Sequence, residues 1–471
     1  INIKGSLLPE SRMVKFRKTL KAIKQGVPII YQGVLIDNNM HRHGIPDLIV
    51  RTDYINRIVS TPVHEHDVNH PHYYCVIDIK YATLNLKADG NHILATGWSN
   101  YYKSQTFIYN ECLAKIQNFN PHKAYVLGRR WTYTKTGIQY RGDECFERLG
   151  IIDFTNIDNH IPEQVAAAEH WIRDLRQHHQ EWSLDPYLNP SKKRIDDIST
   201  GKYQLPTDEM YPNMCNARDE PYNRLKHKLA YNIGEITTVW MCGPKQRDFA
   251  HAKGIFSWRD LRCTAEVLGF TGKRSQIVNQ ILKVNRQDKH RIFPTSFNPS
   301  AWTYKPKIEF YVDFEALNGV IEDFKEFPAA QESTTVFMIN VGYTTKTSYK
   351  FKQFCADTLT HKSERQIFID MINFINKKSN KYKVKNPLLF HWGDYEPVQW
   401  DRVSHLTLLP KLQATWYNLH RTFIEEPIAV RDCFDYSLKS VVPALFDHGL
   451  IQHTWDTNLT GKDSTSVALK W

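Results

Sequence analysis

The sequence predicts a mixed α/β protein with more than one domain. Its 471 residues exceed what a single hydrophobic core usually supports. Short apolar stretches rich in β-branched and aromatic residues alternate with runs of helical periodicity near the start of the chain and again near its end. A hydrophobic content of 41% and an aromatic content of 13% are those of a folded protein. We expect three parts, at residues 1–160, 161–300 and 301–471.

The first part has the pattern of a helix, three strands, a second helix and a fourth strand. Residues 11–24 place apolar side chains on one helical stripe, which a Gly-Val-Pro segment ends. Residues 100–118 have a similar helical pattern. The strands are expected, in order, at 27–36, 46–51, 73–84 and 124–134. This order predicts a mostly buried sheet.

The rest of the chain divides into a helical middle and a second α/β part. A helix is expected at 163–182, and the polar, Pro- and Ser-rich stretch 183–213 predicts a linker or long surface loop. Short helices return at 224–284, and the segment 293–299 is a second joint. Three strands, a helix and another strand follow it.

The net charge and the cysteine content limit which classes of partner and which cellular compartments are expected. The formal net charge of +11 permits a polyanionic partner without requiring one. The eight cysteines contain no Cys-x-x-Cys pair, so reduced thiols of an intracellular protein, cytoplasmic or nuclear, are expected. No apolar run approaches the ~20 residues of a membrane span, and no signal peptide is recognisable. The start at Ile1 and the end at Trp471, just after an apparent motif, suggest a piece of a longer protein.

Three residues in the first part have the pattern of a metal-dependent phosphodiesterase site. Asp47 begins one predicted strand, and Asp78 and Lys80 lie in the next. Side chains two apart on a strand share a face, so Asp78 and Lys80 point the same way. Hard cations such as Mg²⁺ take carboxylate oxygens. The lysine would hold a water or stabilise charge that builds on the phosphate oxygens.

The following helix adds a second set of candidates. Gln105 and Tyr109 are four residues apart and therefore share a helix face. With Lys103 beside them, this face suits a phosphate-contacting or site-bracing role. His41 and His43, shortly before Asp47, are further candidates for nucleic-acid contact.

These residues resemble the P-D-(D/E)-x-K nuclease superfamily, and Gln-x-x-x-Tyr after the lysine is similar to its RecB-like branch. The resemblance covers roughly residues 10–135 and implies a restriction-endonuclease-like α/β domain. It implies Mg²⁺ or Mn²⁺ at Asp47 and Asp78, a catalytic Lys80, and a site completed by Gln105 and Tyr109. The cysteine spacing does not support the iron–sulfur cluster of many relatives, and Glu10 is only a weak match to the acidic residue that the branch often has on its first helix.

The last part carries a second series of acidic residues. Asp313 and Glu315 occupy one face of a predicted strand, an arrangement that suits a two-metal site. Asp394 or Glu396 ends a later strand, and Asp432 and Asp463 follow.

This series resembles the ribonuclease H-like fold, in particular DEDD-type 3′–5′ exonuclease domains found behind RecB-like domains. Asp313 and Glu315 match the first motif, and the choice between Asp394 and Glu396 for the second stays open. Asp432 and Asp463 are weaker matches, and residues 437–441 resemble the family's late helix. The resemblance implies that these acids bind metal.

A stretch of the middle, residues 236–261, resembles a degraded helix-hairpin-helix. In such a module, backbone N–H groups of a tight turn contact a phosphate. Gly243 and Lys245 would make these contacts here. An ordinary helical connector is the alternative.

The sequence therefore predicts a Mg²⁺- or Mn²⁺-dependent nuclease, with DNA favoured over RNA as substrate and no membrane partner. An exonuclease of replication, repair or the processing of a mobile element or virus fits this pattern. One alternative is a non-catalytic nucleic-acid-binding scaffold with vestigial nuclease folds. Another is a 3′–5′ exonuclease acting on RNA or single strands through the C-terminal acids.

Overall fold

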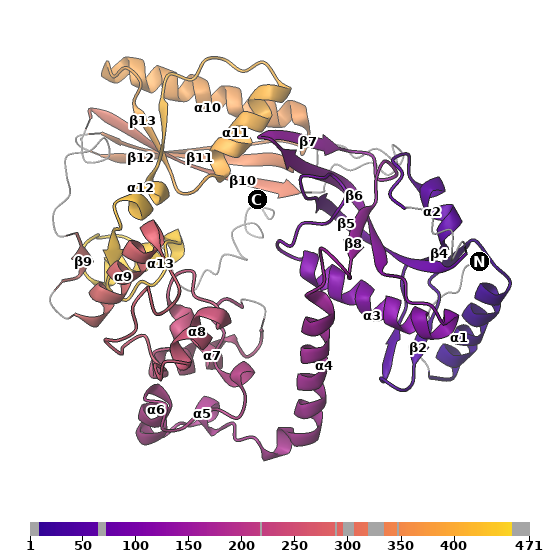
Figure 1. Ribbon diagram of the computed structural model, residues 1–471. Helices are drawn as coiled ribbons and strands as arrows, with labels where there is room; N and C mark the ends of the chain where they lie inside the picture. The colour runs from indigo at the N-terminus through magenta and orange to yellow at the C-terminus, as the bar shows by residue number, and fades with distance from the viewer. Residues whose placement is uncertain are drawn as a thin grey trace. The chain divides into compact units, whose positions relative to one another are not determined.

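The computed structural model is a mixed α/β protein made of two compact units, which confirms the predicted fold class at that level (Figure 1). The first unit extends to His179, and the second begins at Gln180. The structure describes residues 9–64, 72–216, 219–287, 290–294, 306–318, 334–345 and 348–454.

The first unit contains a sheet flanked by helices. Its helices are α1 (Pro9–Lys24), α2 (Thr52–Ile58), α3 (Ser99–Gln117) and α4 (Ile161–His178). Its strands are β1 (Ile29–Tyr31), β2 (Leu35–Asp37), β3 (Arg42–Gly44), β4 (Leu48–Arg51), β5 (Tyr74–Asn85), β6 (Lys123–Lys135), β7 (Ile138–Gly142) and β8 (Gly150–Asp153). The predicted helices and strands are present except that the strand expected at 27–36 is two short strands, β1 and β2, in two different sheets. Elements α2, β3, β7 and β8 were not expected.

The sheet of the first unit has the order β1-β4-β5-β6-β7, and β8 also pairs with β6. Strands β5 and β6 are parallel and are joined through α3, as parallel neighbours require a crossover. On β5, Val76 packs with Leu113 of α3, whereas Ile77 packs with Ile55 of α2. Strand alternation therefore directs Asp78 toward the α3 side of the sheet.

The second unit begins with helices and continues into a second sheet. The helices are α5 (Asp185–Leu188), α6 (Lys192–Ser199), α7 (Asn223–Ile233), α8 (Pro244–His251), α9 (Gly272–Arg286), α10 (His361–Tyr382), α11 (Tyr395–Leu406), α12 (Leu419–Glu425) and α13 (Leu438–Asp447). The strands are β9 (Ile292–Phe293), β10 (Ile308–Asn318), β11 (Thr334–Thr345), β12 (Tyr349–Cys355), β13 (Leu388–His391), β14 (Thr415–Asn418) and β15 (Ala429–Val430).

The larger sheet of the second unit has the order β12-β11-β10-β13-β14. β10, β11 and β12 are antiparallel neighbours, whereas β13 is parallel to β10 and β14 to β13. Helix α10 packs on one face, where Phe310 of β10 and Ile339 of β11 meet its Phe368 (Figure 1). The opposite face carries the alternating partners of these residues, including Asp313 and Asn340.

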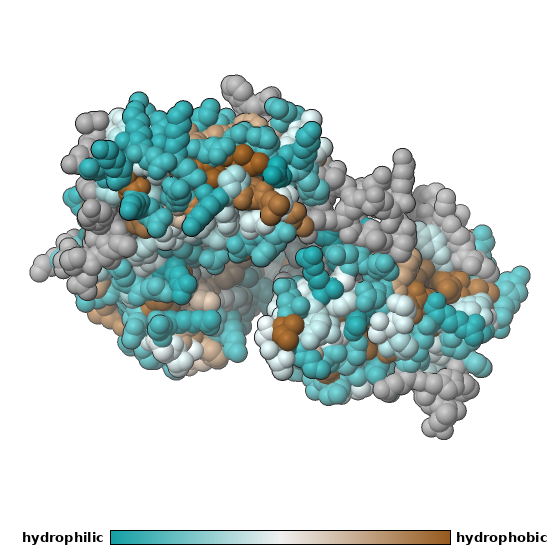
Figure 2. All heavy atoms as spheres, turned by 90° about the horizontal axis from the view of Figure 1, so that it is seen from above, coloured by the Kyte–Doolittle hydropathy of each residue, from teal (hydrophilic) through white to brown (hydrophobic). Residues whose placement is uncertain are grey.

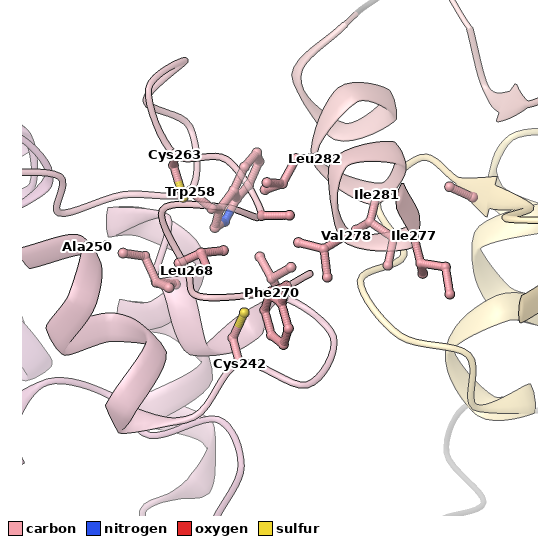
Figure 3. Close-up of a cluster of buried hydrophobic side chains, with 14 of the residues drawn as sticks. Cys242, Ala250, Trp258, Cys263, Leu268, Phe270, Ile277, Val278, Ile281 and Leu282 are labelled. Atoms are coloured by element: carbon pink, nitrogen blue, oxygen red, sulfur yellow. The ribbon is translucent and has the colours of Figure 1, made fainter. Parts of the chain in front are cut away.

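The helical middle packs with the C-terminal part of the chain instead of forming a third unit. Its core joins α8, the following loop and α9, with Trp258, Phe270 and Ile281 among the buried side chains (Figure 3). Tyr436 belongs to the same core, and β15 pairs with β9. The structure thus groups the expected segments 161–300 and 301–471 differently, with α4 in the first unit.

The stretch 183–213 is folded, so the expected linker or loop is wrong. It forms α5, α6 and a 3-10 turn, Asp208–Met210. Ile198 and Leu205 are buried in a small core with Ile233 of α7. A polar stretch with few apolar residues gives little periodicity by itself, and the helix that covers it lies further along the chain.

The face shown in Figure 2 is mostly hydrophilic, with some hydrophobic patches. Within the described residues, no helix combines the length and apolar character that a membrane crossing requires.

Candidate active site

The register of β4 and β5 brings Asp47 beside Asp78. Leu48 pairs with Ile77 in this antiparallel ladder, so the residues that come next, Asp47 and Asp78, lie opposite each other. Oδ2 of Asp47 accepts a hydrogen bond of 2.8 Å from the backbone N–H of Ile79. The two predicted metal-binding carboxylates are therefore neighbours.

Lys80 links these acids to α3. Its Nζ lies 2.6 Å from Oδ2 of Asp78 and donates a hydrogen bond of 2.9 Å to Oε1 of Gln105. Gln105 Nε2 in turn donates to the hydroxyl of Tyr109 at 2.7 Å. The structure thus brings all five predicted residues together, and we call Asp47, Asp78, Lys80, Gln105 and Tyr109 the Asp78 cluster.

Electrostatics in the Asp78 cluster disfavour ionisation of Asp78. Burial raises its pKa most, the nearby Asp47 raises it further, and Lys80 offsets part of the rise. Burial also raises the pKa of Tyr109, while its hydrogen bond with Gln105 acts in the opposite direction. A divalent cation between the carboxylates would relieve the repulsion that raises the pKa of Asp78.

Two residues that the sequence interpretation missed support this cluster. The Lys80 ammonium lies 5.0 Å from the centre of the Tyr102 ring, a cation–π distance. Tyr102 is three residues before Gln105 on the same helix face, so helical spacing could have indicated it. A Cβ on Gly44 would lie 2.2 Å from the Tyr109 ring, so only glycine lets β3 approach that ring.

The positions of His41, His43 and Glu10 neither support nor contradict their predicted roles. His41 and His43 are exposed on the β2–β3 hairpin, three and one residues from Gly44. Their contact with nucleic acid stays a prediction. The side chain of Glu10 lies outside the described residues.

The prediction that Lys103 contacts nucleic acid is wrong. Its side chain is 0% exposed, and Nζ donates to Oδ1 of Asp158 at 2.6 Å and to the carbonyl of Ile93 at 2.8 Å. Residues two apart on a helix point about 200° apart, so Lys103 faces away from Gln105. It fastens α3 to the loops around Ile93 and Asp158.

A second set of carboxylates meets on the open face of the second sheet. The charge of Asp313 raises the pKa of both Glu315 and Glu396, in each case after burial as the larger cause. Asp313 is exposed to a cavity by its accessible surface, and the protein atoms packed around its carboxyl still raise its pKa. We call Asp313, Glu315 and Glu396 the Asp313 cluster. Of the two alternatives for the second motif, Glu396 is therefore the one that joins it.

The remaining predicted metal ligands lie elsewhere or outside the described residues. Asp394 is exposed and accepts a hydrogen bond of 2.8 Å from Nδ2 of Asn418. Asp432 is exposed with Nε2 of His448 3.1 Å from its Oδ2, so the structure does not bring it into the Asp313 cluster. Asp463 lies outside the described residues.

Glu396 is the most unusual member of the Asp313 cluster. Its side chain is 7% exposed, and Oε2 is buried without a hydrogen-bond partner among the described residues. Nδ1 of His391 lies 4.0 Å from it and is engaged with the carbonyl of Gly393. Burial, with the charges of Asp313 and Glu315, raises the pKa of Glu396 to about 7. Lys439, which lowers the pKa of Glu315, and His391 were missed by the sequence interpretation.

The middle does not form the expected helix-hairpin-helix. Residues Ile236–Thr238 are one buried 3-10 turn instead of a first helix. The N–H of Gly243, at the start of α8, already donates to Oε1 of Gln246 at 3.0 Å, so it is not free for a phosphate. Lys245 is exposed, with Nζ 5.7 Å from the centre of the Phe249 ring. The connector alternative describes this segment better.

Neither cluster is a closed cage of metal ligands. In the part of the chain that the structure describes, no group of three or more His, Cys, Asp or Glu side chains is arranged to hold a metal ion. The eight cysteines are all free thiols. The paired carboxylates still fit Mg²⁺ or Mn²⁺ chemistry, because Mg²⁺ commonly binds one or two carboxylates and completes its shell with water and substrate phosphates.

The resemblances to RecB-like and ribonuclease H-like domains stay predictions from the sequence. No protein-family model matches the chain, and no curated protein matches it. The geometry of the two carboxylate clusters is the basis for the proposals below.

Replacing Lys103 tests its assignment as a structural residue. We expect Lys103→Met to leave the Asp158 carboxylate buried without its counter-ion and to lower the stability of the first unit by about 3–5 kcal/mol. Urea denaturation, with hydrogen exchange of the α3 amides, measures this loss. Lys115→Met, an exposed change on the same helix, should have little effect. Equal stability of the two variants would contradict the assignment.

The pKa of Glu396 predicts a pH-dependent stability. A pKa raised from 4.5 to about 7 means that the folded state holds this proton more tightly, so stability falls as pH rises through that window. We expect Glu396→Gln to match wild type below about pH 4 and to exceed it by at most roughly 3 kcal/mol above about pH 8. Urea unfolding across this pH range measures the difference. Asp401→Asn, an exposed change on the same helix, should show no such trend.

Proposed function

We propose that this chain is a metal-dependent nuclease that hydrolyses phosphodiester bonds of DNA with the Asp78 cluster. The continuous series of contacts from Asp47 and Asp78 through Lys80 to Gln105 and Tyr109 carries the proposal. These residues come from two strands and a helix, and an ammonium, two carboxylates and two neutral hydrogen-bonding groups meet there. Buried acids with raised pKa values occur preferentially at functional sites.

Each residue has a distinct part in this proposal. Asp47 and Asp78 would hold Mg²⁺ or Mn²⁺, which neutralises charge on the phosphate oxygens. Lys80, 21% exposed, directs its ammonium at the attacking water or at a phosphate oxygen. Gln105 accepts from Lys80 and so fixes the direction of the ammonium, and Tyr109 fixes the Gln105 amide.

A second candidate activity uses the Asp313 cluster. Three neighbouring carboxylates, one of them buried without a partner, favour a cation site in the second unit. The activity would be hydrolysis of RNA or a single strand from its 3′ end, as the resemblance to DEDD exonucleases implies. The rival from another class is a nucleic-acid-binding scaffold in which neither cluster cuts.

Cleavage by site variants tests the proposed nuclease. With Mg²⁺ and end-labelled single- and double-stranded DNA and RNA, we expect Asp78→Asn and Lys80→Ala each to slow DNA cleavage by about 100-fold or more, because charge stabilisation at the phosphate is lost. Lys135→Ala, an exposed strand lysine, should cut at the wild-type rate. EDTA should stop cleavage.

The same assay separates the alternatives. Loss of cleavage in Asp313→Asn, with normal rates in Asp78→Asn, would assign the activity to the second unit. No cleavage by the wild-type chain under any of these conditions would favour the scaffold.

Metal binding can be measured without cleavage. A cation bound only by the folded state raises stability, and the gain grows with its concentration. We expect Mg²⁺ or Mn²⁺ to raise the unfolding midpoint of the first unit by thermal melting, and Asp78→Asn to remove most of that gain. In metal-free buffer Asp78→Asn should be more stable than wild type near neutral pH, because it removes a carboxylate whose pKa is raised. A variant that responds to Mg²⁺ as wild type does would place the cation elsewhere.

A further inference from the structure

A cavity of about 630 Å³ lies on the open face of the second sheet, beside the Asp313 cluster. This volume is within the range of about 300–1,000 Å³ that is usual for ligand sites. Asp313 and Glu396 line the cavity together with residues of the four neighbouring strands β10, β11, β12 and β13 and of the segments that follow β13. The sheet positions that line it are Tyr311, Val312, Asp313, Asn340, Gly342, Tyr349, Phe351, Gln353, Phe390 and His391.

The strand register explains why these side chains meet. Asp313 pairs with Asn340, and Asn340 pairs with Gln353, which gives a polar row across β10, β11 and β12. In the neighbouring row, Gly342 pairs with Phe351 of β12. Gly342 has no side chain, and a Cβ there would come within 2.5 Å of the Tyr349 hydroxyl, so the Tyr349 side chain lies over this glycine.

Two aromatic rings of β12 face solvent in this cavity. Tyr349 is 64% exposed and Phe351 is 57% exposed, although both belong to a well-formed edge strand. Phe354, on the other face of β12, is buried against α10. Aromatic side chains exposed next to one another on a sheet leave much apolar surface in water, which a planar ligand would cover. We call Tyr349 and Phe351 the β12 platform.

The carboxylate end of the cavity also lacks a partner. Glu396 lines the cavity, and its Oε2 is buried without a hydrogen bond from the described residues. A ligand that covers the two aromatic rings and also brings a cation or a hydrogen-bond donor to Glu396 would match both ends of the cavity. The amides of Asn340 and Gln353 lie between, and their own contact is a hydrogen bond of 3.2 Å.

We propose that this cavity binds unpaired nucleotides of a single nucleic-acid strand, with bases stacked on the β12 platform and a phosphate directed toward Asp313 and Glu396. The inference rests on the second candidate activity and adds to it the residues that select the substrate. Stacking on an aromatic ring needs a base whose face is free, so a paired duplex would not fit. The side-chain amides of the polar row suit the donor and acceptor edges of a base.

The chemistry of the lining favours this occupant over an apolar one. A lipid chain or an apolar protein segment would cover the rings but would leave Oε2 of Glu396 without a partner and would shield the amides of Asn340 and Gln353 from water, at a cost for each polar group that loses its solvation. A nucleotide brings a planar ring, hydrogen-bonding edges and an anionic group that shares a divalent cation with carboxylates. The net charge of +11 is compatible with a polyanionic strand.

Photocrosslinking of the full chain tests the position of the strand. A short single-stranded DNA containing 5-iodouracil is irradiated with the protein in Ca²⁺, which takes the same oxygen ligands as Mg²⁺. We expect crosslinked peptides that contain Tyr349 or Phe351 with the single strand, and none at these residues with a blunt duplex of the same sequence. Crosslinks confined to other peptides, or an equal yield with duplex, would overturn the proposal.

Variants give a second measurement on the same probe. Stacking on one ring is worth ~1–3 kcal/mol, so Tyr349→Ala and Phe351→Ala should each weaken binding of the fluorescent single strand about tenfold in anisotropy titrations. Tyr222→Ala removes a ring that is 68% exposed outside this cavity and should leave the affinity unchanged. Equal affinities for all three variants would refute the platform.

These measurements do not depend on hydrolysis. A chain that crosslinks at β12 but cuts no substrate keeps the β12 platform and refutes the nuclease. A chain that cuts single strands without crosslinks at β12 keeps the nuclease and refutes the platform.

Discussion

The arrangement of the first unit depends on the contacts that stabilise one buried carboxylate. Asp78 lies in the middle of a sheet strand beside a second acid, and both burial and that neighbour disfavour its charge. The ammonium of Lys80, 2.6 Å away, offsets part of this cost and is itself held by Gln105. The ladder of β4 and β5 and the packing of α3 are therefore also the means by which opposite charges are kept in contact. A purely structural sheet would gain more from an apolar residue at this position.

The second unit also contains a buried carboxylate whose charge is disfavoured, and fewer contacts compensate for that cost. Glu396 follows β13 at the start of α11, within range of two other acids, and has no cation at hydrogen-bond distance among the described residues. The rise of its pKa from 4.5 to about 7 shows how strongly the folded state disfavours the charge on Glu396. Proteins keep such destabilising groups mainly where function requires them. Two separate sheets of this chain each carry one, and Glu235, between α7 and α8, is a third buried carboxylate with a raised pKa that belongs to neither cluster.

Local periodicity predicted two pairs within the Asp78 cluster, whereas its longer steps, 32 residues between Asp47 and Ile79 and 25 between Lys80 and Gln105, were indicated by the resemblance to RecB-like nucleases. Strand alternation related Asp78 to Lys80, and helical spacing related Gln105 to Tyr109. Contacts between residues that lie far apart in the chain were predicted less well from periodicity. Lys103 was misplaced although helical spacing alone turns it away from Gln105, and its actual partner, Asp158, lies 55 residues away. The core under 183–213 depends on α7. Asp394 and Glu396 could not be separated, because the choice depends on where α11 begins and on which side chain then turns toward β10.

Raised acid pKa values also determine how cations and protons compete at these sites. A carboxylate must lose its proton to bind Mg²⁺ or Mn²⁺, so cation binding releases protons where the pKa is raised. At Glu396 this competition extends to about neutral pH, whereas Asp78 has Lys80 within 2.6 Å to oppose protonation. Lys80 offsets only part of the rise in the pKa of Asp78, so a cation at the Asp78 cluster would also have to displace a proton that burial and the neighbouring Asp47 favour.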